Sequence, residues 1–312
     1  MKRVLFIFCF CLSFGFFFTE LAAAQSSLFK YTIIPESPRP GEPVTIGVNT
    51  DVRQAALFAN EKLLSKAAFF SVPSADGKPG FMAALLTIPS TANSGDALIK
   101  LEDETGVICE IPVTIAAREF VSEVIPLNSV LTGIRTDPDP RKTAEANRLW
   151  AILSRTGYEI FHTVKFVPPV ASTRRTSFFG DRRVYKYSNG TNDTSIHAGV
   201  DFGVPTGTRV LACATGRVVL AANRVVTGNS VVIEHAPGVY SLYYHLDKID
   251  VKEGDIVNSG ELLGLSGATG LATGPHLHWE IRVNTENTDP DAFIGRHIID
   301  KDAIISKLYS KD

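Results

Sequence analysis

This chain of 312 residues has few cysteines and a net charge close to zero. Four Cys are too few for a disulfide-dense scaffold. A net charge of −2 excludes a strongly basic nucleic-acid binder as the default, and a hydrophobic content of 45% excludes a disordered acidic chain. Gly (24) and Pro (17) are plentiful, which favours short strands and turns over a helical bundle. The length predicts two domains of about 150 residues each.

Long apolar runs are also rare, and the clearest one begins at residue 4. Lys2 and Arg3 precede the almost wholly apolar residues 4–18, and small residues follow at 22–24. A basic start, a short apolar core and a small-residue cleavage site predict a secretory signal peptide over residues 1–24. An uncleaved N-terminal anchor is the alternative, although the run is short for a membrane span. We expect export to the periplasm or cell envelope and no membrane span in the mature chain.

Two cysteines remain outside this segment, Cys109 and Cys213, because Cys9 and Cys11 lie inside the apolar run. The two are far apart in the sequence, and each falls in a strand-like stretch. Buried free thiols are predicted in preference to a disulfide bridge.

Short strands separated by turns fill the next part of the chain. Residues 29–34 and 111–115 each have a strand pattern, and residues 97–101 are expected to pair with residues 107–111. Strands at this spacing predict an Ig-like β-sandwich over residues 25–118.

The pattern changes over residues 119–170. The helix-start signal Asp137-Pro138-Asp139-Pro140 precedes residues 143–155, whose apolar side chains fall on roughly one side. One helix is expected there, which predicts a short helical connector. Strands and glycine turns return over residues 171–295, and a short helix over 301–309 is expected in a tail formed by residues 296–312. The predicted fold class is mainly β.

Histidines with suggestive neighbours lie in the last β-rich segment. His276 and His278 are two residues apart, so in a strand both imidazoles face the same side. Two histidines on one side suit one metal ion, or one ligand beside an acid/base group.

A carboxylate adds to this group. Asp201 follows His197 by four residues, which is about 13 Å in a straight strand and too far for one ion. Gly199 between them allows a bend, and an imidazole with a carboxylate is a good pair of zinc ligands. With His245, five candidate residues lie in one segment, which predicts a metal site.

The strings around these residues resemble peptidase family M23, the lysostaphin/LytM-type zinc metallopeptidases that cut peptidoglycan peptides. The resemblance covers residues 174–290 and follows the family's order of motifs: Ser177-Phe178-Phe179-Gly180-Asp181-Arg182, His197-Ala198-Gly199-Val200-Asp201-Phe202, Thr273-Gly274-Pro275-His276-Leu277-His278 and Asp289-Pro290. It implies an M23-type peptidase domain over residues 171–295. A sandwich followed by a helical connector is similar to some secreted members.

The resemblance also implies roles. His197, Asp201 and His278 match the ligands of one Zn²⁺ ion, and His245 and His276 match the catalytic pair beside it. Three ligands leave one zinc position for water. One histidine of the pair would take a proton from that water while the other stabilises the oxyanion, and the assignment of the two is left open. The presence of all five argues against members that have lost zinc.

Four further residues complete the predicted site. Tyr243, Tyr244 and Arg182 are expected to contact substrate, and Glu280 is expected to orient a ligand histidine from behind. Tyr244 stands where a small residue is frequent in the family, which would narrow the cleft.

The other histidines and a basic cluster have two interpretations. His162 is interpreted as structural, His235 as orienting a hairpin and His297 as lying past the domain's end. Asp181 is the single acidic residue near the basic cluster in the sequence. The cluster is either a solvated or internally paired face, or a contact for substrate carboxylates or an anionic wall. Its members are Arg174, Arg175, Arg182, Arg183 and Lys186.

The predicted function is that of a secreted zinc metalloendopeptidase, which hydrolyses peptide bonds in peptidoglycan stem peptides or cross-links. The alternative is a regulator that keeps zinc but activates another cell-wall hydrolase. A third hypothesis is latency, with the N-terminal part covering the site. The expected partners are peptidoglycan peptides and, through the N-terminal domain, another cell-wall protein, but not nucleic acid. The scissile bond and the oligomeric state are left open.

Overall fold

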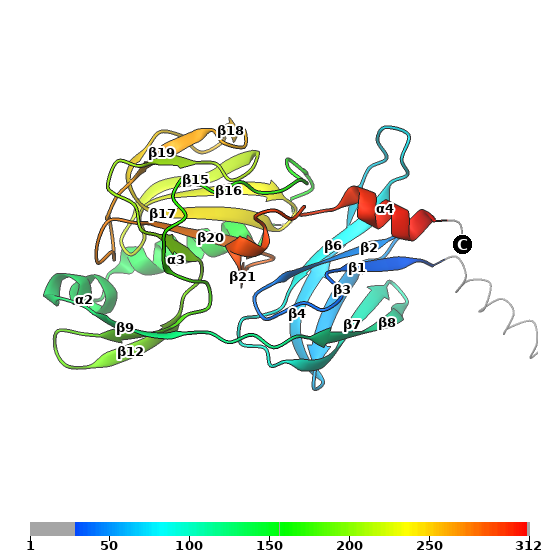
Figure 1. Cartoon of the computed structure of the whole chain (residues 1–312), viewed down its shortest axis with the longest axis horizontal. Helices are drawn as coiled ribbons and strands as arrows, with labels where there is room; N and C mark the ends of the chain where they lie inside the picture. Colours follow the sequence, from blue (N-terminus) through cyan, green and yellow to red (C-terminus); the bar gives the residue numbers. More distant parts are fainter. Residues whose placement is uncertain (1–28, 156, 311–312) are drawn as a thin grey trace, which may run out of the picture.

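The computed structural model describes residues 29–155 and 157–310 (Figure 1). The predicted signal peptide, residues 1–24, lies outside the described residues. Within the described part, strands form most of the regular structure, so the mainly β fold class is confirmed. No helix among the described residues is long and apolar enough to cross a membrane.

Two four-stranded antiparallel sheets enclose the N-terminal core. Residues such as Ile46, Leu57 and Ile99 are fully buried between the sheets, as alternation along half-buried strands predicts. The two strands expected to pair are neighbours, but their register differs from the prediction, because residues 97–101 lie opposite residues 109–113, with Ile99 opposite Ile111. The Ig-like detail stays a prediction. In spatial order the first sheet is β1 (Tyr31–Ile34), β2 (Pro43–Val48), β6 (Phe81–Thr87) and β5 (Phe70–Val72), and the second is β4 (Lys62–Ala68), β3 (Gln54–Ala59), β7 (Gly95–Asp103) and β8 (Gly106–Ile115).

The connector differs from its prediction, because it holds one strand and two helices. Asn128 begins the helix α2 (Ser129–Thr136) by accepting a hydrogen bond from a backbone amide, and Asp139 does the same for α3 (Pro140–Leu153). The strand β9 (Ser122–Pro126) precedes both and pairs in parallel with β11 (Arg182–Lys186). Its partner is 60 residues away, so local periodicity could not predict this strand.

The C-terminal domain is built on one large antiparallel sheet. Its main path runs β10 (Arg175–Ser177), β13 (Val200–Phe202), β20 (Leu277–Val283), β17 (Val239–Ile249), β16 (Gly228–Ala236), β15 (Gly216–Arg224) and β18 (Ile256–Val257). Off this path lie β14 (Arg209–Leu211), β19 (Leu262–Ser266) and β21 (Glu286–Thr288). A separate small sheet consists of β12 (Asn192–Ile196), β11 and β9.

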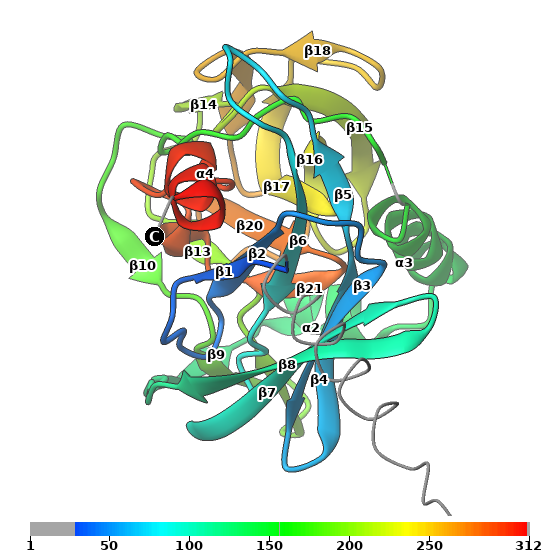
Figure 2. The same cartoon turned by 90° about the vertical axis from the view of Figure 1, so that its right-hand side faces the viewer.

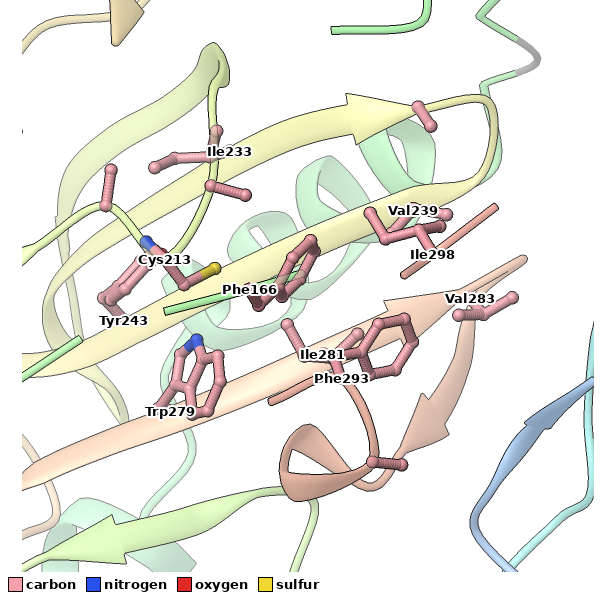
Figure 3. Packing of buried hydrophobic residues seen from close by; sticks show 14 of the residues in the cluster. Phe166, Cys213, Ile233, Val239, Tyr243, Trp279, Ile281, Val283, Phe293 and Ile298 are labelled. Atoms are coloured by element: carbon pink, nitrogen blue, oxygen red, sulfur yellow. The ribbon is translucent and has the colours of Figure 1, made fainter. Parts of the chain in front are cut away.

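The two faces of this sheet are covered differently. Trp279, Tyr243 and Phe166 pack into the main core on one face, where Figure 3 shows Cys213 beside them. Both described cysteines are free thiols, and Cys213 is buried as predicted, while Cys109 is half-buried. On the other face, α3 packs Ile152 and Leu153 against a set of apolar residues: Leu220, Val232, Tyr240, Leu242 and Tyr244. Side chains on either face of β17 are therefore shielded from water over residues 239–246.

The C-terminal tail returns to the first domain. The predicted helix over 301–309 is present as α4 (Lys301–Tyr309), and it follows the short 3₁₀ helix η1 (Pro290–Ala292). Figure 2 shows α4 next to β1 and β2, and a Cβ added to Gly47 of β2 would lie 2.5 Å from a methyl group of Ile304. The Thr45 hydroxyl also donates to the Ile298 carbonyl at 3.0 Å. The tail thus ties the C-terminal domain to the N-terminal sandwich.

Candidate metal centre

Three ligand-type side chains meet where β13 lies beside β20. Asp201 and His278 are directly opposite each other in this antiparallel pair, and His197 approaches from the bend before β13. The Asp201 Oδ1 atom lies 2.7 Å from His278 Nδ1 and 3.2 Å from His197 Nε2. His197 Nε2 and His278 Nδ1 are 3.0 Å apart. All three ligand atoms lie within 4.8 Å of one another, so one ion could contact each of them.

Gly199 makes the bend between His197 and Asp201 possible. A Cβ at this position would lie 2.2 Å from the carbonyl oxygen of Trp279, which is backbone of β20. Only a residue without a Cβ lets the two chains approach this closely.

Replacing Gly199 by Ala is therefore expected to push β13 away from β20 and to destabilise the protein. Inserting a methyl group into such a packed contact costs about 1–3 kcal/mol of unfolding free energy. Urea unfolding and zinc binding would both be measured. Gly274→Ala is the matched control, since a Cβ there meets nothing within 4 Å. Equal stability of the two variants would contradict this account of Gly199.

The outer nitrogen of each ligand histidine is hydrogen-bonded, which fixes its ring. His197 Nδ1 donates to the Phe178 carbonyl at 2.7 Å, and His278 Nε2 donates to Glu280 Oε1 at 3.0 Å. These bonds direct the remaining nitrogens, His197 Nε2 and His278 Nδ1, towards Asp201. Burial opposes ionisation of Glu280, but Arg282 and His278 outweigh it and lower the pKa of Glu280 to about 2.

The centre favours a positive charge. His197, Asp201 and His278 are 2%, 6% and 7% exposed. Burial opposes protonation of His278, yet its hydrogen bonds to Asp201 and Glu280 raise its pKa to about 9. Burial also opposes ionisation of Asp201, but the two histidines hold its pKa well below the usual range. Two imidazole nitrogens and one carboxylate oxygen, in surroundings that stabilise a cation, fit a transition-metal ion of the zinc type.

His245 and His276 form a second pair beside the ligands. Their ring centroids are 4.8 Å apart, and His276 Nε2 lies 3.8 Å from Asp201 Oδ1. Each donates its Nδ1 hydrogen to a backbone carbonyl, Thr269 at 2.7 Å for His245 and Gly274 at 2.8 Å for His276. Nε2 of each ring is therefore the nitrogen left for chemistry.

The backbone at His245 is held in an unusual conformation. Its φ is +63°, in the left-handed region that non-glycine residues seldom adopt, and its amide donates to the Thr227 carbonyl at 2.9 Å. Such strain persists where the surrounding structure fixes a functional side chain. Burial, followed by the charges of His276 and His278, lowers the pKa of His245 to about 3, so its ring is neutral at ordinary pH.

The tyrosines predicted to contact substrate lie elsewhere. Tyr243 and Tyr244 are neighbours in β17 and point to opposite faces. The Tyr243 ring is fully buried in the core (Figure 3), and its hydroxyl accepts a hydrogen bond from the Cys213 amide at 2.9 Å. The substrate prediction for Tyr243 is therefore wrong. Tyr244 is 3% exposed and stacks on His278 with a centroid distance of 5.5 Å, so it supports the His278 ring from behind.

Arg182 also differs from its prediction. Its guanidinium donates to the Gly180 carbonyl at 2.9 Å and to the Ser90 carbonyl of the N-terminal sandwich at 2.8 Å. The group also lies over the Phe120 ring. These contacts join the two domains and take the place of the expected contact with substrate.

The basic cluster is largely paired inside the protein. Arg175 binds Asp291 at 2.7 Å, and Arg183 binds Asp201 at 2.7 Å as well as Glu123. The sequence showed only Asp181 as an opposing charge, because the true partners are distant along the chain. The contact of Arg183 with Asp201 is the feature of the site that sequence reasoning missed.

The remaining histidines lie outside the centre. His162 is buried and contacts the Lys165 carbonyl, and His235 is fully buried within β16 against Ser241 and Thr215. His297 is exposed and forms an isolated backbone bridge with Lys165. Their structural interpretation agrees with these positions.

Comparison with known proteins identifies the domain that carries the centre. Residues 195–290 match the family described as peptidase family M23. The C-terminal domain of this chain belongs to that family. The M23 domain thus includes His197, Asp201, His245, His276 and His278, while β9 and β11 lie outside the matched residues.

Curated relatives are similar to part of this chain. The chain is 39% identical over 124 residues to the DD-carboxypeptidase/endopeptidase Mpg of Neisseria meningitidis serogroup B, covering 40% of this chain and 28% of the relative. It is 34% identical over 170 residues to the peptidoglycan DD-endopeptidase ShyA of Vibrio cholerae serotype O1, covering 54% of this chain and 39% of the relative. The chain therefore spans well under half the length of these relatives.

One solved structure resembles most of the chain. It is a candidate M23 peptidase from Pseudomonas aeruginosa, with a TM-score of 0.58 and 26% identity. The similarity covers 83% of this chain and 95% of the other. The likeness therefore extends beyond the M23 domain into the N-terminal half.

Proposed function

We propose that this chain is a secreted zinc metalloendopeptidase that hydrolyses peptide bonds in peptidoglycan stem peptides or cross-links. The observation that carries the proposal is the convergence of His197, Asp201 and His278 beside a second histidine pair. The names of the relatives support the bond class, because Mpg is described as a DD-carboxypeptidase/endopeptidase and ShyA as a peptidoglycan DD-endopeptidase. Export is inferred from the sequence pattern of residues 1–24.

The donor set suits one catalytic zinc ion. Two histidines and one carboxylate are three protein ligands, which leave the fourth position of a tetrahedral site open. When bound, zinc would polarise the scissile carbonyl and lower the pKa of a water molecule to about 7.

His245 and His276 supply the proton transfers. Since each Nδ1 is held by a carbonyl, Nε2 of one ring accepts the proton that the attacking water loses, and then returns it to the leaving amine. The other ring, carrying a proton on Nε2 that it takes from solvent before the step, donates a hydrogen bond to the oxyanion that forms on the carbonyl. His245 is buried and His276 is half-buried, and the reduced contact with water strengthens both interactions.

Digestion of purified peptidoglycan tests the proposal. The zinc-loaded chain is expected to convert cross-linked muropeptides into uncross-linked or shortened ones, with each mass change equal to one added water. Mass analysis of the products would also name the scissile bond. The control is the same protein carrying His245→Ala.

Two outcomes would contradict the proposed activity. A chain that binds one zinc and leaves the muropeptide pattern unchanged is not a peptidoglycan endopeptidase. Cleavage that appears only with an added amidase, and survives His245→Ala, would instead support the regulator that activates another hydrolase.

A further inference from the structure

Asp201 offers its two oxygens to different partners. Oδ1 faces His197 and His278, whereas Oδ2 accepts a hydrogen bond from Arg183 Nη2 at 2.7 Å. The Arg183 side chain is 12% exposed and that of Asp201 is 9% exposed, so water screens this ion pair weakly. A cation at the centre would therefore meet one oxygen of the carboxylate, with the other already occupied.

Arg183 is itself held from two sides. Its Nη2 also donates to the Ser177 hydroxyl at 2.7 Å, and its Nε donates to Glu123 Oε1 at 2.5 Å. Glu123 lies in the connector strand β9, directly opposite Arg183 of β11 in the parallel pairing. The Glu123 carboxylate of the connector thus contacts Arg183, which in turn contacts Asp201 of the metal centre.

We infer that Arg183 and Glu123 are positioning residues of the metal centre. Arg183 fixes Asp201 as a ligand that presents a single oxygen, and Glu123 balances the arginine charge beside the cation. The inference rests on the zinc site proposed above and extends it. Neither residue lies within the matched residues 195–290, so the complete centre includes a strand of the connector.

The opposite charges of Arg183 and Glu123 explain why the metal centre needs both residues. A guanidinium bound to a ligand carboxylate repels a divalent cation, and burial makes that repulsion strong. Glu123 compensates it, because it contacts the same guanidinium. Without Arg183, the Asp201 carboxylate is no longer held in place and binds the metal less tightly, and its free Oδ2 competes for the position that catalytic zinc leaves open to water.

Zinc affinity of the full chain tests the inference. Four variants are compared with the unmutated protein by competition against a chromophoric chelator: Glu123→Gln, Arg183→Met, the double variant, and Glu119→Gln. Glu119 is an exposed carboxylate in the same segment and serves as the matched control. We expect Glu123→Gln to weaken zinc binding about tenfold and Arg183→Met by about 10–100-fold, as for other partners of metal ligands.

Two further readouts separate positioning from a general structural role. If Glu123 acts through Arg183, the double variant binds zinc no more weakly than Arg183→Met alone. With Co²⁺ in place of zinc, Arg183→Met is expected to lower the visible absorption, because a second Asp201 oxygen raises the coordination number. Glu123→Gln and Glu119→Gln are expected to leave that spectrum unchanged. Unfolding of the metal-free variants checks that all remain folded.

The outcomes that overturn the inference are specific. If Glu123→Gln binds zinc as tightly as Glu119→Gln, Glu123 has no role in the metal centre. If the losses of zinc affinity add in the double variant, Glu123 does not act through Arg183. An unchanged affinity and cobalt spectrum in Arg183→Met removes the role of Arg183. Failure of the unmutated chain to bind zinc overturns the proposed metalloenzyme itself.

Discussion

A His278→Ala variant is expected to bind no zinc at micromolar concentrations and to release no peptides from peptidoglycan. His278 is one of three side chains that converge on one point, and its Nδ1 is the atom nearest to Asp201 Oδ1, at 2.7 Å. Loss of a direct ligand costs more than the about 10–100-fold in metal affinity that loss of an outer partner costs. Metal analysis of the purified variant and the muropeptide assay measure the two effects.

Thermal unfolding gives a second measure of the same prediction. A metal that binds only the folded state raises the stability by RT ln(1 + [M]/Kd), so a chelator is expected to lower the Tm of the unmutated chain. The same chelator should not change the Tm of His278→Ala. His297→Ala is the control, because His297 is an exposed histidine outside the centre. Retention of one zinc per chain by His278→Ala would contradict the ligand assignment.

The short spacings within the centre were predictable from the sequence, whereas only the resemblance to peptidase family M23 implied that His197, Asp201 and His278 form one set. The two-residue spacing predicted that His276 and His278 lie on one side, and both do lie near Asp201. His276 precedes β20 and is not a member of the cluster formed by His197, Asp201 and His278. The opposition of Asp201 and His278 was beyond the sequence, because it depends on which strands are neighbours. Asp201 and His278 are 77 residues apart, and only the sheet order places β13 beside β20.

The wrong predictions share one physical cause. Residues next to each other in a strand face opposite sides, and the sequence does not say which side is which when both are covered. Tyr243 therefore lies in the core while Tyr244 supports His278. Arg182 and Arg183 are neighbours in β11, and Arg183, not Arg182, reaches the centre.

The connector was misjudged for a related reason. A single amphipathic stretch and an Asp-Pro signal predicted one helix, and α3 does begin at Pro140. The strand β9 has one valine, Val124, which is exposed, and it gains its backbone partners from β11, far along the chain, so tertiary pairing outweighs local pattern there. The same long-range pairing brings Glu123 to Arg183, which no spacing in the sequence could indicate.

Replacing His245 or His276 by Ala is expected to lower kcat for peptidoglycan hydrolysis by about 10²–10⁴-fold, the range for loss of one acid/base group. Zinc should remain bound in both variants, because neither histidine belongs to the three-atom cluster. Each Nδ1 is held by a backbone carbonyl, so each substitution removes one Nε2 atom from the site and leaves the rings of His197 and His278 in place.

The double variant sharpens this prediction. If one histidine moves the proton and the other holds the oxyanion during the same step, the two losses are strongly non-additive, and the double variant is only slightly slower than the worse single one. Zinc content and kcat are measured on the same preparations, with His297→Ala again as the control. Loss of zinc from His245→Ala, or a kcat within threefold of the unmutated chain for both single variants, would contradict the assignment. A large loss of kcat with full zinc content would show that His245 and His276 act in the chemical step and do not hold the metal.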